Sequence, residues 1–492
     1  MANTKWIQNL LSRENVLVIA AILLLLLSYG PHFCHSFDDA FITYRYARNL
    51  AQGDGLVFNP GVQILGTTAA GWAVILSVCG FVLGSDTIPC VSGFLALAAL
   101  IGSAWLIAGF VRATERRSDT FVPLSILLAC NRWLIEILGH EEFAVTLLVL
   151  LGLGLIQQKK LAVSGIVWSI GIFIRPDTAV MGAAAGLEEW HRTRRFPRAL
   201  FISTVFGTIL AALLVFALSG HILPSSLAVK KAEATNSLLT VGSGFWHQLW
   251  AWFWRTWGWG GPLATIVAAA GLSWLLRNRL EKTLRIFIPA VAITIFYPVV
   301  GVPFAPWYLV YPVFCILFGM AVFMARVFGT QGWVVRVGVT IAVFISLLPQ
   351  ISWAIENRHT APDPRKGHME AAARWIDDHP DPEGSIAVVE VGFLGWACER
   401  PILDLMGLNS PGALQALMVQ QVPRFFFAEG PAFFVFNTNF QYIFGDLLKH
   451  PAFLDQYEVV HTIPPTSRHV VPVQIWQRKE PSSTKSPEEH LH

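Results

Sequence analysis

Long apolar segments recur along most of this chain and constrain its fold more than any other feature. A helix needs about 20 apolar residues to cross a bilayer. Roughly 11 segments approach this length; they cover residues 14–31, 88–111, 119–138, 142–157, 161–177, 178–190, 199–219, 259–276, 285–302, 307–325 and 334–351. The sequence therefore predicts a polytopic α-helical membrane protein, because helices satisfy their own backbone hydrogen bonds in lipid.

Composition supports a lipid-embedded chain and argues against nucleic acid as a partner. Hydrophobic residues make up 54% of the sequence and charged residues only 14%. The net charge is +3, and the basic residues lie in short clusters between apolar segments instead of forming one continuous basic face. We therefore expect membrane lipids, and no nucleic acid, around this protein.

The first apolar segment is predicted to stay attached as a membrane span. Lys5 and Arg13 precede it, as in a signal peptide, but the residues that follow, 29–32, are Tyr-Gly-Pro-His. These residues lack the small-x-small pattern of a cleavage site.

The basic residues indicate the orientation of the spans, because cytoplasmic loops are enriched in Lys and Arg. We weighed residues 67–83 as a span or as an interfacial helix on the outer surface. Only the interfacial assignment places these basic residues on the cytoplasmic side with the N-terminus: Arg112, Arg116, Arg117, Lys159, Lys160, Arg192, Arg194, Arg195, Arg198, Arg277, Arg279, Lys282, Arg285, Arg326 and Arg336. The first loop, about 31–87, and the C-terminal segment then lie outside the cytoplasm.

The sequence divides into three parts. Residues 1–355 are predicted to form the transmembrane module, residues 356–480 a small soluble outer α/β domain, and residues 481–492 a disordered tail. Within the outer domain we expect a helix at 369–378 and strands at 385–391 and 433–436.

Two adjacent carboxylates, Asp38 and Asp39, open the first outer loop. A helix that starts here would keep them ionised near its N-terminus and would carry Arg45 and Arg48 about two turns further along. Either carboxylate could act as a base. A helix cap with ordinary interfacial charges explains the pattern equally well.

A second acidic site follows the third span at His140, Glu141 and Glu142. Carboxylates at membrane depth are costly unless they are paired or face a wet cavity. A divalent cation is a further possibility without a recognised ligand spacing; its candidate ligands are His32, His35, Asp38, Asp39, His140, Glu141 and Glu142.

Cations on the outer side run against the general charge bias. Arg175 and Lys230 would each be stabilised by an anion such as a lipid phosphate. The alternative is that Arg175 pairs with Asp177 and that Lys230 is solvated. The tryptophan-rich segment 246–257 is typical of an interfacial aromatic belt.

The six cysteines show no metal-ligand spacing, and most lie in or beside apolar segments. We expect them to act as small hydrophobic residues; they are Cys34, Cys79, Cys90, Cys130, Cys315 and Cys398.

Residues 37–61, FDDAFITYRYARNLAQGDGLVFNPG, resemble the first outer loop of GT-C class membrane glycosyltransferases. The similarity is to bacterial enzymes related to the mycobacterial arabinofuranosyltransferases and, more remotely, to protein O-mannosyltransferases. Shorter matches follow in the same order: 139–141, 175–177, 223–224 with Lys230, 306–308, 391–395 and 401–408. Residues 64–70 and 225–226 depart from the family pattern.

This resemblance implies an inverting transferase that moves a hexose or pentose from a polyprenyl-phosphate donor, outside the cytoplasmic membrane, to a glycan, lipid or protein acceptor of the cell envelope. Asp38, or alternatively Asp39, would be the base. Arg175, Lys230 or Arg45 would bind the donor phosphate. His140, Glu141, Glu142 and Asp177 would orient the acceptor or hold a divalent cation. The competing hypotheses are a transporter of lipid-linked sugars and an inactive scaffold; polar residues near the ends of the spans, and not at mid-membrane, favour the enzyme.

Overall fold

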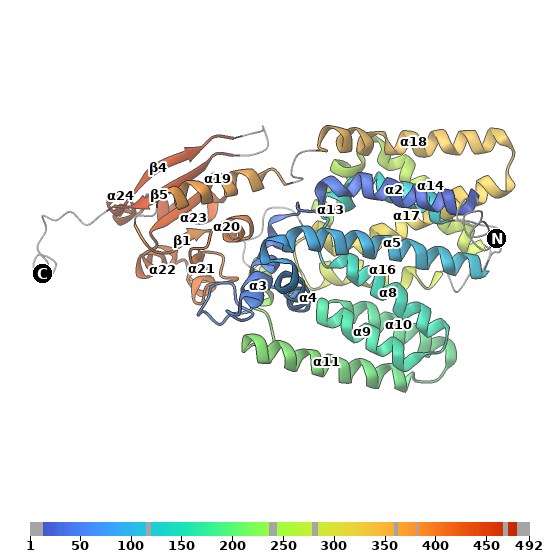
Figure 1. Cartoon of the computed structure of the whole chain (residues 1–492), viewed down its shortest axis with the longest axis horizontal. Helices are drawn as coiled ribbons and strands as arrows, with labels where there is room; N and C mark the ends of the chain where they lie inside the picture. The colour runs from blue at the N-terminus through green and yellow to red at the C-terminus, as the bar shows by residue number, and fades with distance from the viewer. Residues whose placement is uncertain are drawn as a thin grey trace, which may run out of the picture.

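The computed structural model describes residues 13–114, 120–235, 244–277, 284–358, 363–379, 382–465 and 471–479. Figure 1 shows a helical bundle, most of whose helices run along the long axis of the molecule, and a smaller α/β domain at one end of the bundle. The chain enters at the far end of the bundle, and its C-terminal part lies in the α/β domain.

Each predicted span contains at least one helix. The bundle helices are α2 (Arg13–Tyr29), α5 (Ile88–Thr114), α6 (Phe121–Ala129), α7 (Arg132–Glu136), α8 (Glu142–Gln157), α9 (Leu161–Ile174), α10 (Thr178–Thr193), α11 (Arg198–Ser219), α14 (Gly261–Arg277), α16 (Phe287–Val299), α17 (Val310–Thr330) and α18 (Trp333–Glu356). Within the described residues, 6 helical stretches are long and apolar enough to cross a membrane. The expectation of about 11 crossings stays a prediction for the shorter helices.

The predicted third span, 119–138, is not one continuous helix. It breaks between α6 and α7, where Asn131 adopts an extended backbone and its side chain accepts a hydrogen bond from Leu134 N at 3.0 Å. Arg132 then pairs with Glu136 at 2.9 Å inside α7. The asparagine therefore starts a new helix where the apolar pattern predicted a continuous one.

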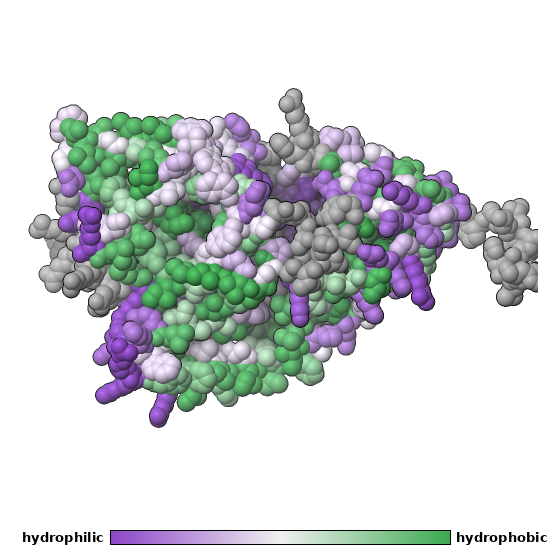
Figure 2. All heavy atoms as spheres, turned by 180° about the vertical axis from the view of Figure 1, so that it is seen from behind, coloured by the Kyte–Doolittle hydropathy of each residue, from purple (hydrophilic) through white to green (hydrophobic). Residues whose placement is uncertain are grey.

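The surface of the bundle matches a membrane environment. Figure 2 shows hydrophobic residues around the middle of the bundle and hydrophilic residues gathered at the end away from the α/β domain. On α11, for example, Ile202 and Phe206 are 64% and 63% exposed, which is costly in water and favourable in lipid. The turn that contains Arg192 and Arg198 lies at the end of the bundle opposite the α/β domain, together with the N-terminus.

Short elements of the predicted outer loops lie where the bundle meets the α/β domain (Figure 1). They include α3 (Asp38–Gln52), α4 (Ala70–Leu83), α12 (Ser226–Thr235), α13 (Phe245–Trp257) and the 3-10 helix η4 (Pro306–Leu309). Helix α4, the predicted interfacial segment, packs against α3, α5 and α9.

A disulfide bond between Cys34 and Cys90 joins the residues before α3 to the first turn of α5. The prediction that all cysteines act as small hydrophobic residues is therefore wrong for these two. The remaining four are free thiols: Cys79, Cys130, Cys315 and Cys398. The bond links the first outer loop covalently to the bundle.

The C-terminal domain is built on a five-stranded mixed sheet in the order β2-β1-β3-β5-β4. The strands are β1 (Ile386–Val388), β2 (Ile402–Asp404), β3 (Phe433–Asn437), β4 (Tyr457–Ile463) and β5 (Val473–Arg478). The first three are parallel, while β5 and β4 are antiparallel additions. The helices are α19 (Arg365–Asp378), α20 (Val391–Ala397), α21 (Ala413–Met418), α22 (Val422–Glu429), α23 (Gln441–Lys449) and α24 (Pro451–Gln456). The predicted strand 385–391 ends early, because Val391 already begins α20.

Candidate functional site

Helix α3 presents its two N-terminal carboxylates to different surroundings. Asp38 is 6% exposed and accepts backbone hydrogen bonds from Gly392 N at 3.1 Å and Phe393 N at 2.7 Å, at the start of α20. A Cβ on Gly392 would collide with the backbone of Asp38, so only glycine permits this approach. Burial raises the pKa of Asp38 to about 7. Asp38 therefore joins the bundle to the C-terminal domain, whereas Asp39 is exposed.

Arg45 binds the opposite end of α20. Its guanidinium donates to the carbonyl oxygens of Gly395, Cys398 and Arg400, and to Phe58 O at 2.8 Å. Asp38 at the N-terminus and Arg45 at the C-terminus both match the sign of the helix dipole of α20. Arg45 does not line the cavity described next, so the structure gives no support to its predicted role as a phosphate ligand.

A cavity of about 150 Å³ opens where the bundle meets the C-terminal domain. Its polar lining includes the carboxylates of Asp39 and Glu141, the imidazole of His140 and the cationic side chains of Arg175 and Lys230. These residues come from the start of α3, the connection between α7 and α8, the end of α9, and α12. The cavity therefore gathers five of the predicted site residues from four separate segments.

Arg175 is the centre of a charged network on one side of the cavity. Its guanidinium contacts a carboxylate oxygen of Glu141, Glu142 Oε1 at 2.8 Å and Asp177 Oδ2 at 2.8 Å. The hydroxyl of Tyr297 also donates to Asp177. One guanidinium faces three carboxylates, so the network carries excess negative charge if all three are ionised. The predicted alternative, a pair between Arg175 and Asp177, is present, but it is part of this larger network.

His140 lies between the carboxylates and an aromatic wall. Its ring stacks on Trp307 with centroids 4.8 Å apart, and its Nδ1 is 3.8 Å from Glu142 Oε2. Burial lowers the pKa of His140 to about 3, so the imidazole is neutral at physiological pH. Its Nε2 is buried and has no hydrogen-bond partner among the described residues.

The three residues His140, Glu141 and Glu142 could hold a metal ion. One candidate ligand atom from each of them lies within 4.8 Å of the others. A neutral imidazole with a carboxylate pair suits Zn²⁺ or Mn²⁺.

The other predicted histidine ligands make different contacts. His35 Nδ1 lies 3.0 Å from Lys366 Nζ, which also donates to Cys34 O at 3.0 Å. His32 stacks on Trp353 with centroids 6.3 Å apart. The structure thus separates His32, His35 and Asp38 from the cluster around His140.

The remaining wall contains residues that the sequence reasoning did not assign to the site. Thr43 and Thr67 share a hydrogen bond of 2.9 Å at the cavity edge, and the C-terminal domain contributes Leu408. Trp307 and Tyr308 form the aromatic side, with Tyr308 stacked on Tyr297 at 4.1 Å. The motif 306–308 was the sequence signal for these rings.

Comparisons with known proteins agree with this architecture. A family model described as Domain of unknown function (DUF8728) matches residues 355–480. A terminal β-(1→2)-arabinofuranosyltransferase of Mycobacterium tuberculosis is 26% identical over 222 residues, which cover 40% of this chain and 35% of that protein. The match therefore spans about a third of the relative's length.

Two solved structures resemble the whole chain. The Archaeoglobus fulgidus oligosaccharyltransferase, in complex with Zn and sulfate, superimposes with a TM-score of 0.57 at 12% identity, covering 92% of this chain and 72% of that one. ArnT from Cupriavidus metallidurans, bound to undecaprenyl phosphate, gives a TM-score of 0.55 at 13% identity, covering 94% and 97%. The chain has the GT-C fold. The GT-C resemblance read from residues 37–61 is thereby confirmed at the level of the fold.

Proposed function

We propose that this GT-C protein is an inverting glycosyltransferase, which moves a sugar from a polyprenyl-phosphate donor to a glycan, lipid or protein acceptor outside the cytoplasmic membrane. The observation that carries the proposal is the cavity, where an exposed carboxylate, Asp39, shares one small space with the cations Arg175 and Lys230. Sugar transfer from a lipid phosphate needs these two functions: a base for the acceptor hydroxyl and positive charge for the leaving phosphate.

Asp39 is the proposed base. In this mechanism its carboxylate takes the proton of an acceptor hydroxyl, and the hydroxyl oxygen forms a bond to the anomeric carbon. The bond from that carbon to the phosphate oxygen breaks, and its electron pair leaves with the polyprenyl phosphate. Attack from the face opposite the phosphate inverts the configuration. Asp38 remains the alternative base, although it is bound to the amides of Gly392 and Phe393.

Lys230 and Arg175 are the proposed ligands of the phosphate. Lys230 lies on α12. The residue before this helix, Ser225, donates a hydrogen bond from its Oγ to Leu65 O at 3.0 Å. Arg175 is fixed by its carboxylate partners, so it supplies preorganised charge with little motion. Preorganised cations act most strongly where negative charge develops in the transition state.

A divalent cation at His140, Glu141 and Glu142 would add Lewis-acid character next to Arg175. The buried and unpartnered Nε2 of His140 and the closeness of candidate ligand atoms on Glu141 and Glu142 support its binding. Zn accompanies the related oligosaccharyltransferase structure. The residues of this chain would still bind and orient the acceptor through Glu141 and Trp307.

The proposed compartment is extracytoplasmic. The disulfide between Cys34 and Cys90 lies four residues before Asp38, and disulfides persist in oxidising compartments. Basic residues such as Lys159 and Arg192 lie at the opposite end of the bundle, as expected for its cytoplasmic face. Both observations support the proposal that the cavity and the C-terminal domain lie outside the cytoplasm.

The test is transfer of labelled sugar by purified protein in membranes. The donors are a panel of synthetic polyprenyl-phosphate pentoses and hexoses, including arabinofuranose because of the mycobacterial relative. We expect transfer of one sugar, with Asp39→Asn lowering kcat by about a hundredfold or more while donor binding is retained. Asp54→Asn is the matched control, since Asp54 is an exposed carboxylate of the same loop.

Two results would contradict this assignment. If Asp38→Asn abolishes the chemical step in correctly folded protein and Asp39→Asn does not, the base is Asp38. If no donor supports transfer but labelled lipid-linked sugar crosses the bilayer in a protein-dependent manner, the chain is a transporter. Transfer assays with and without a chelator decide whether the cation takes part.

A further inference from the structure

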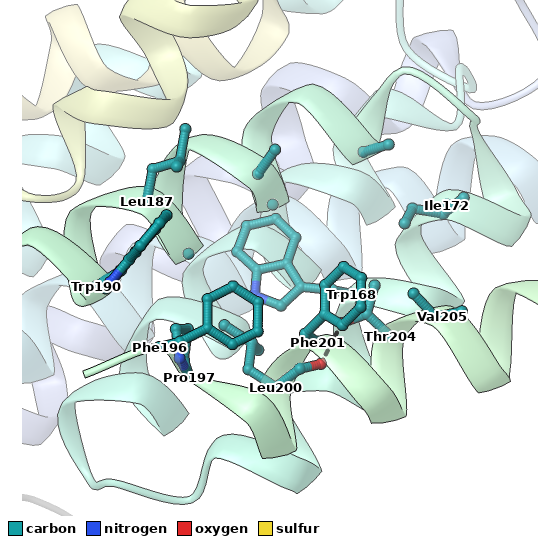
Figure 3. A pocket seen from close by; sticks show the side chains of 14 residues that line it. Trp168, Ile172, Leu187, Trp190, Phe196, Pro197, Leu200, Phe201, Thr204 and Val205 are labelled. Carbon is teal, nitrogen blue, oxygen red and sulfur yellow. Dashed lines mark hydrogen bonds between the residues drawn. The ribbon is translucent and has the colours of Figure 1, made fainter.

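A second cavity lies along the bundle helices, and its lining on α10 begins at Ala179, four residues after Arg175. It is a groove of about 380 Å³ between α9, α10 and α11 (Figure 3). Trp168 forms its floor, and the aromatic rings of Trp190, Phe196 and Phe201 lie around it. Nearly all lining side chains are apolar, so the groove suits a hydrocarbon chain and not a sugar or a nucleotide.

The groove exists because α10 presents small residues on this face. Gly182, Ala183 and Gly186 line it, while the neighbouring Leu187 is 60% exposed. A small-xxx-small face in a membrane helix usually allows close packing of another helix. Here a Cβ on Gly186 would meet only a methyl group of Leu200, at 3.6 Å. No described helix fills the remaining space.

One end of the groove meets a positively charged turn. The chain turns between α10 and α11 at Arg194, which adopts a left-handed backbone conformation with a φ of 55°. Arg195 belongs to the same turn, and Arg198 begins α11. All three arginines are exposed. The carboxylates at this end already have partners, because Glu189 pairs with Arg192, and Glu188 pairs with Arg285 at 3.0 Å. The described ion pairs therefore leave three guanidinium groups uncompensated at the mouth.

The length of the groove fits the hydrocarbon of one leaflet. Its lining on α10 runs from Ala179 to Trp190, which at the helical rise corresponds to about 16 Å. The hydrocarbon core of a bilayer is about 30 Å thick, so this distance is about half of it. The aromatic pair of Trp190 and Phe196, with centroids 5.5 Å apart, marks the interface at the charged end.

We propose that the groove binds one acyl chain of an anionic glycerophospholipid from the cytoplasmic leaflet, with the lipid phosphate held by Arg194, Arg195 and Arg198. Planar guanidinium groups bind phosphate through paired hydrogen bonds, and the apolar groove accepts the chain below it. The arginines of this lipid site lie at the opposite end of the bundle from the cavity at Asp39. It does not depend on the proposed glycosyltransferase activity.

Native mass spectrometry of the purified protein tests the site, with phosphatidylglycerol and phosphatidylethanolamine of equal chain length as probes. We expect wild type to retain one phosphatidylglycerol after detergent washing. Gly186→Leu should fill the groove, and the triple variant Arg194→Gln, Arg195→Gln, Arg198→Gln should remove the phosphate contacts. Each should lower the retained fraction by about tenfold or more, because both the chain and the headgroup contribute to binding.

Matched controls separate this site from general effects of lipid contact and charge. Gly109→Leu adds the same side chain on α5, where nothing lies within 4 Å. The triple variant Lys159→Gln, Lys160→Gln, Arg336→Gln removes equal charge from the turn after α8 and the first turn of α18. Both should retain the lipid.

Three outcomes would overturn the proposal. Equal retention of phosphatidylethanolamine would show that the arginines do not select an anionic headgroup. Retention of polyprenyl phosphate in place of phosphatidylglycerol would assign the groove to the donor. A dimer that Gly186→Leu dissociates would make it a helix-packing surface between two copies.

Discussion

Replacing Arg45 by Met should loosen the C-terminal domain from the bundle without touching the cavity. The Arg45 side chain is 2% exposed and donates to four carbonyl oxygens, of Phe58, Gly395, Cys398 and Arg400. A buried acceptor left without a donor costs about 1–3 kcal/mol. Phe58 O keeps a second donor, Asn49 Nδ2 at 2.9 Å. The other three acceptors give about 3 kcal/mol at the low end of this range, which allows for entry of water. This is a large part of the 5–15 kcal/mol that typically stabilises a domain.

Hydrogen exchange measured by mass spectrometry reports this loss locally. We expect the backbone amides of residues 391–400 to exchange about a hundredfold faster in Arg45→Met, since about 1.4 kcal/mol corresponds to a factor of ten. Arg48→Met is the matched control. Arg48 donates to Trp396 O at 2.8 Å and only weakly to Gly395 O at 3.4 Å, so its loss should accelerate exchange by about tenfold.

The opposite result would restore the role first inferred from the sequence. If Arg45→Met leaves exchange at residues 391–400 within a few-fold of wild type but raises the KM for the lipid-linked donor, then Arg45 reaches the phosphate. The structural role of Arg45 in binding α20 would then be wrong.

Three further predictions follow from the contacts around the site. The Cys34–Cys90 bond closes a loop with a sequence separation of 56. Its reduction gives the unfolded chain more conformational entropy and should lower the free energy of unfolding by about 4 kcal/mol. An unchanged Tm in reductant would contradict the bond. Burial raises the pKa of Asp38 from 3.8 to about 7, so the folded protein binds this proton more tightly than the unfolded chain does. Thermal stability should therefore fall as pH rises from about 4 to about 7. Asp38→Asn should remove this part of the dependence of Tm on pH, and an identical dependence in both proteins would refute the prediction. His140→Ala should weaken Mn²⁺ or Zn²⁺ binding by at least about tenfold in calorimetry, whereas unchanged affinity would place the ion elsewhere.

Much of the helical architecture follows from the sequence, because each membrane span is a continuous run of apolar residues. Apolar length predicted helices such as α5, α11 and α17 close to their observed bounds. The break at Asn131 was missed because a single polar residue barely changes the hydropathy of its window. The short strand β1 was overextended, since an apolar run does not show where a buried strand ends and a buried helix begins.

Several residues of the candidate cavity were named from the sequence, and the contacts that the sequence could not show share one cause. His140, Glu141 and Arg175 were identified because charge at membrane depth is costly and therefore informative. Asp38 and Asp39 could not be distinguished, because the partner of Asp38 lies 354 residues away at Gly392. The same holds for Arg45, whose acceptors include Cys398, 353 residues along the chain. Partners so distant in the chain leave no trace in the local pattern.

The attachment of α20 to α3 couples the soluble domain mechanically to the first outer loop. Asp38 and Arg45 hold the two ends of α20, and Asp39 follows Asp38 directly in the chain. The Tyr44 hydroxyl of α3 also donates to Gly139 O at 3.0 Å, next to His140, so α3 is bonded to the bundle as well as to the domain. A molecule that displaces the domain would therefore pull through α3 on the surroundings of both Asp39 and His140.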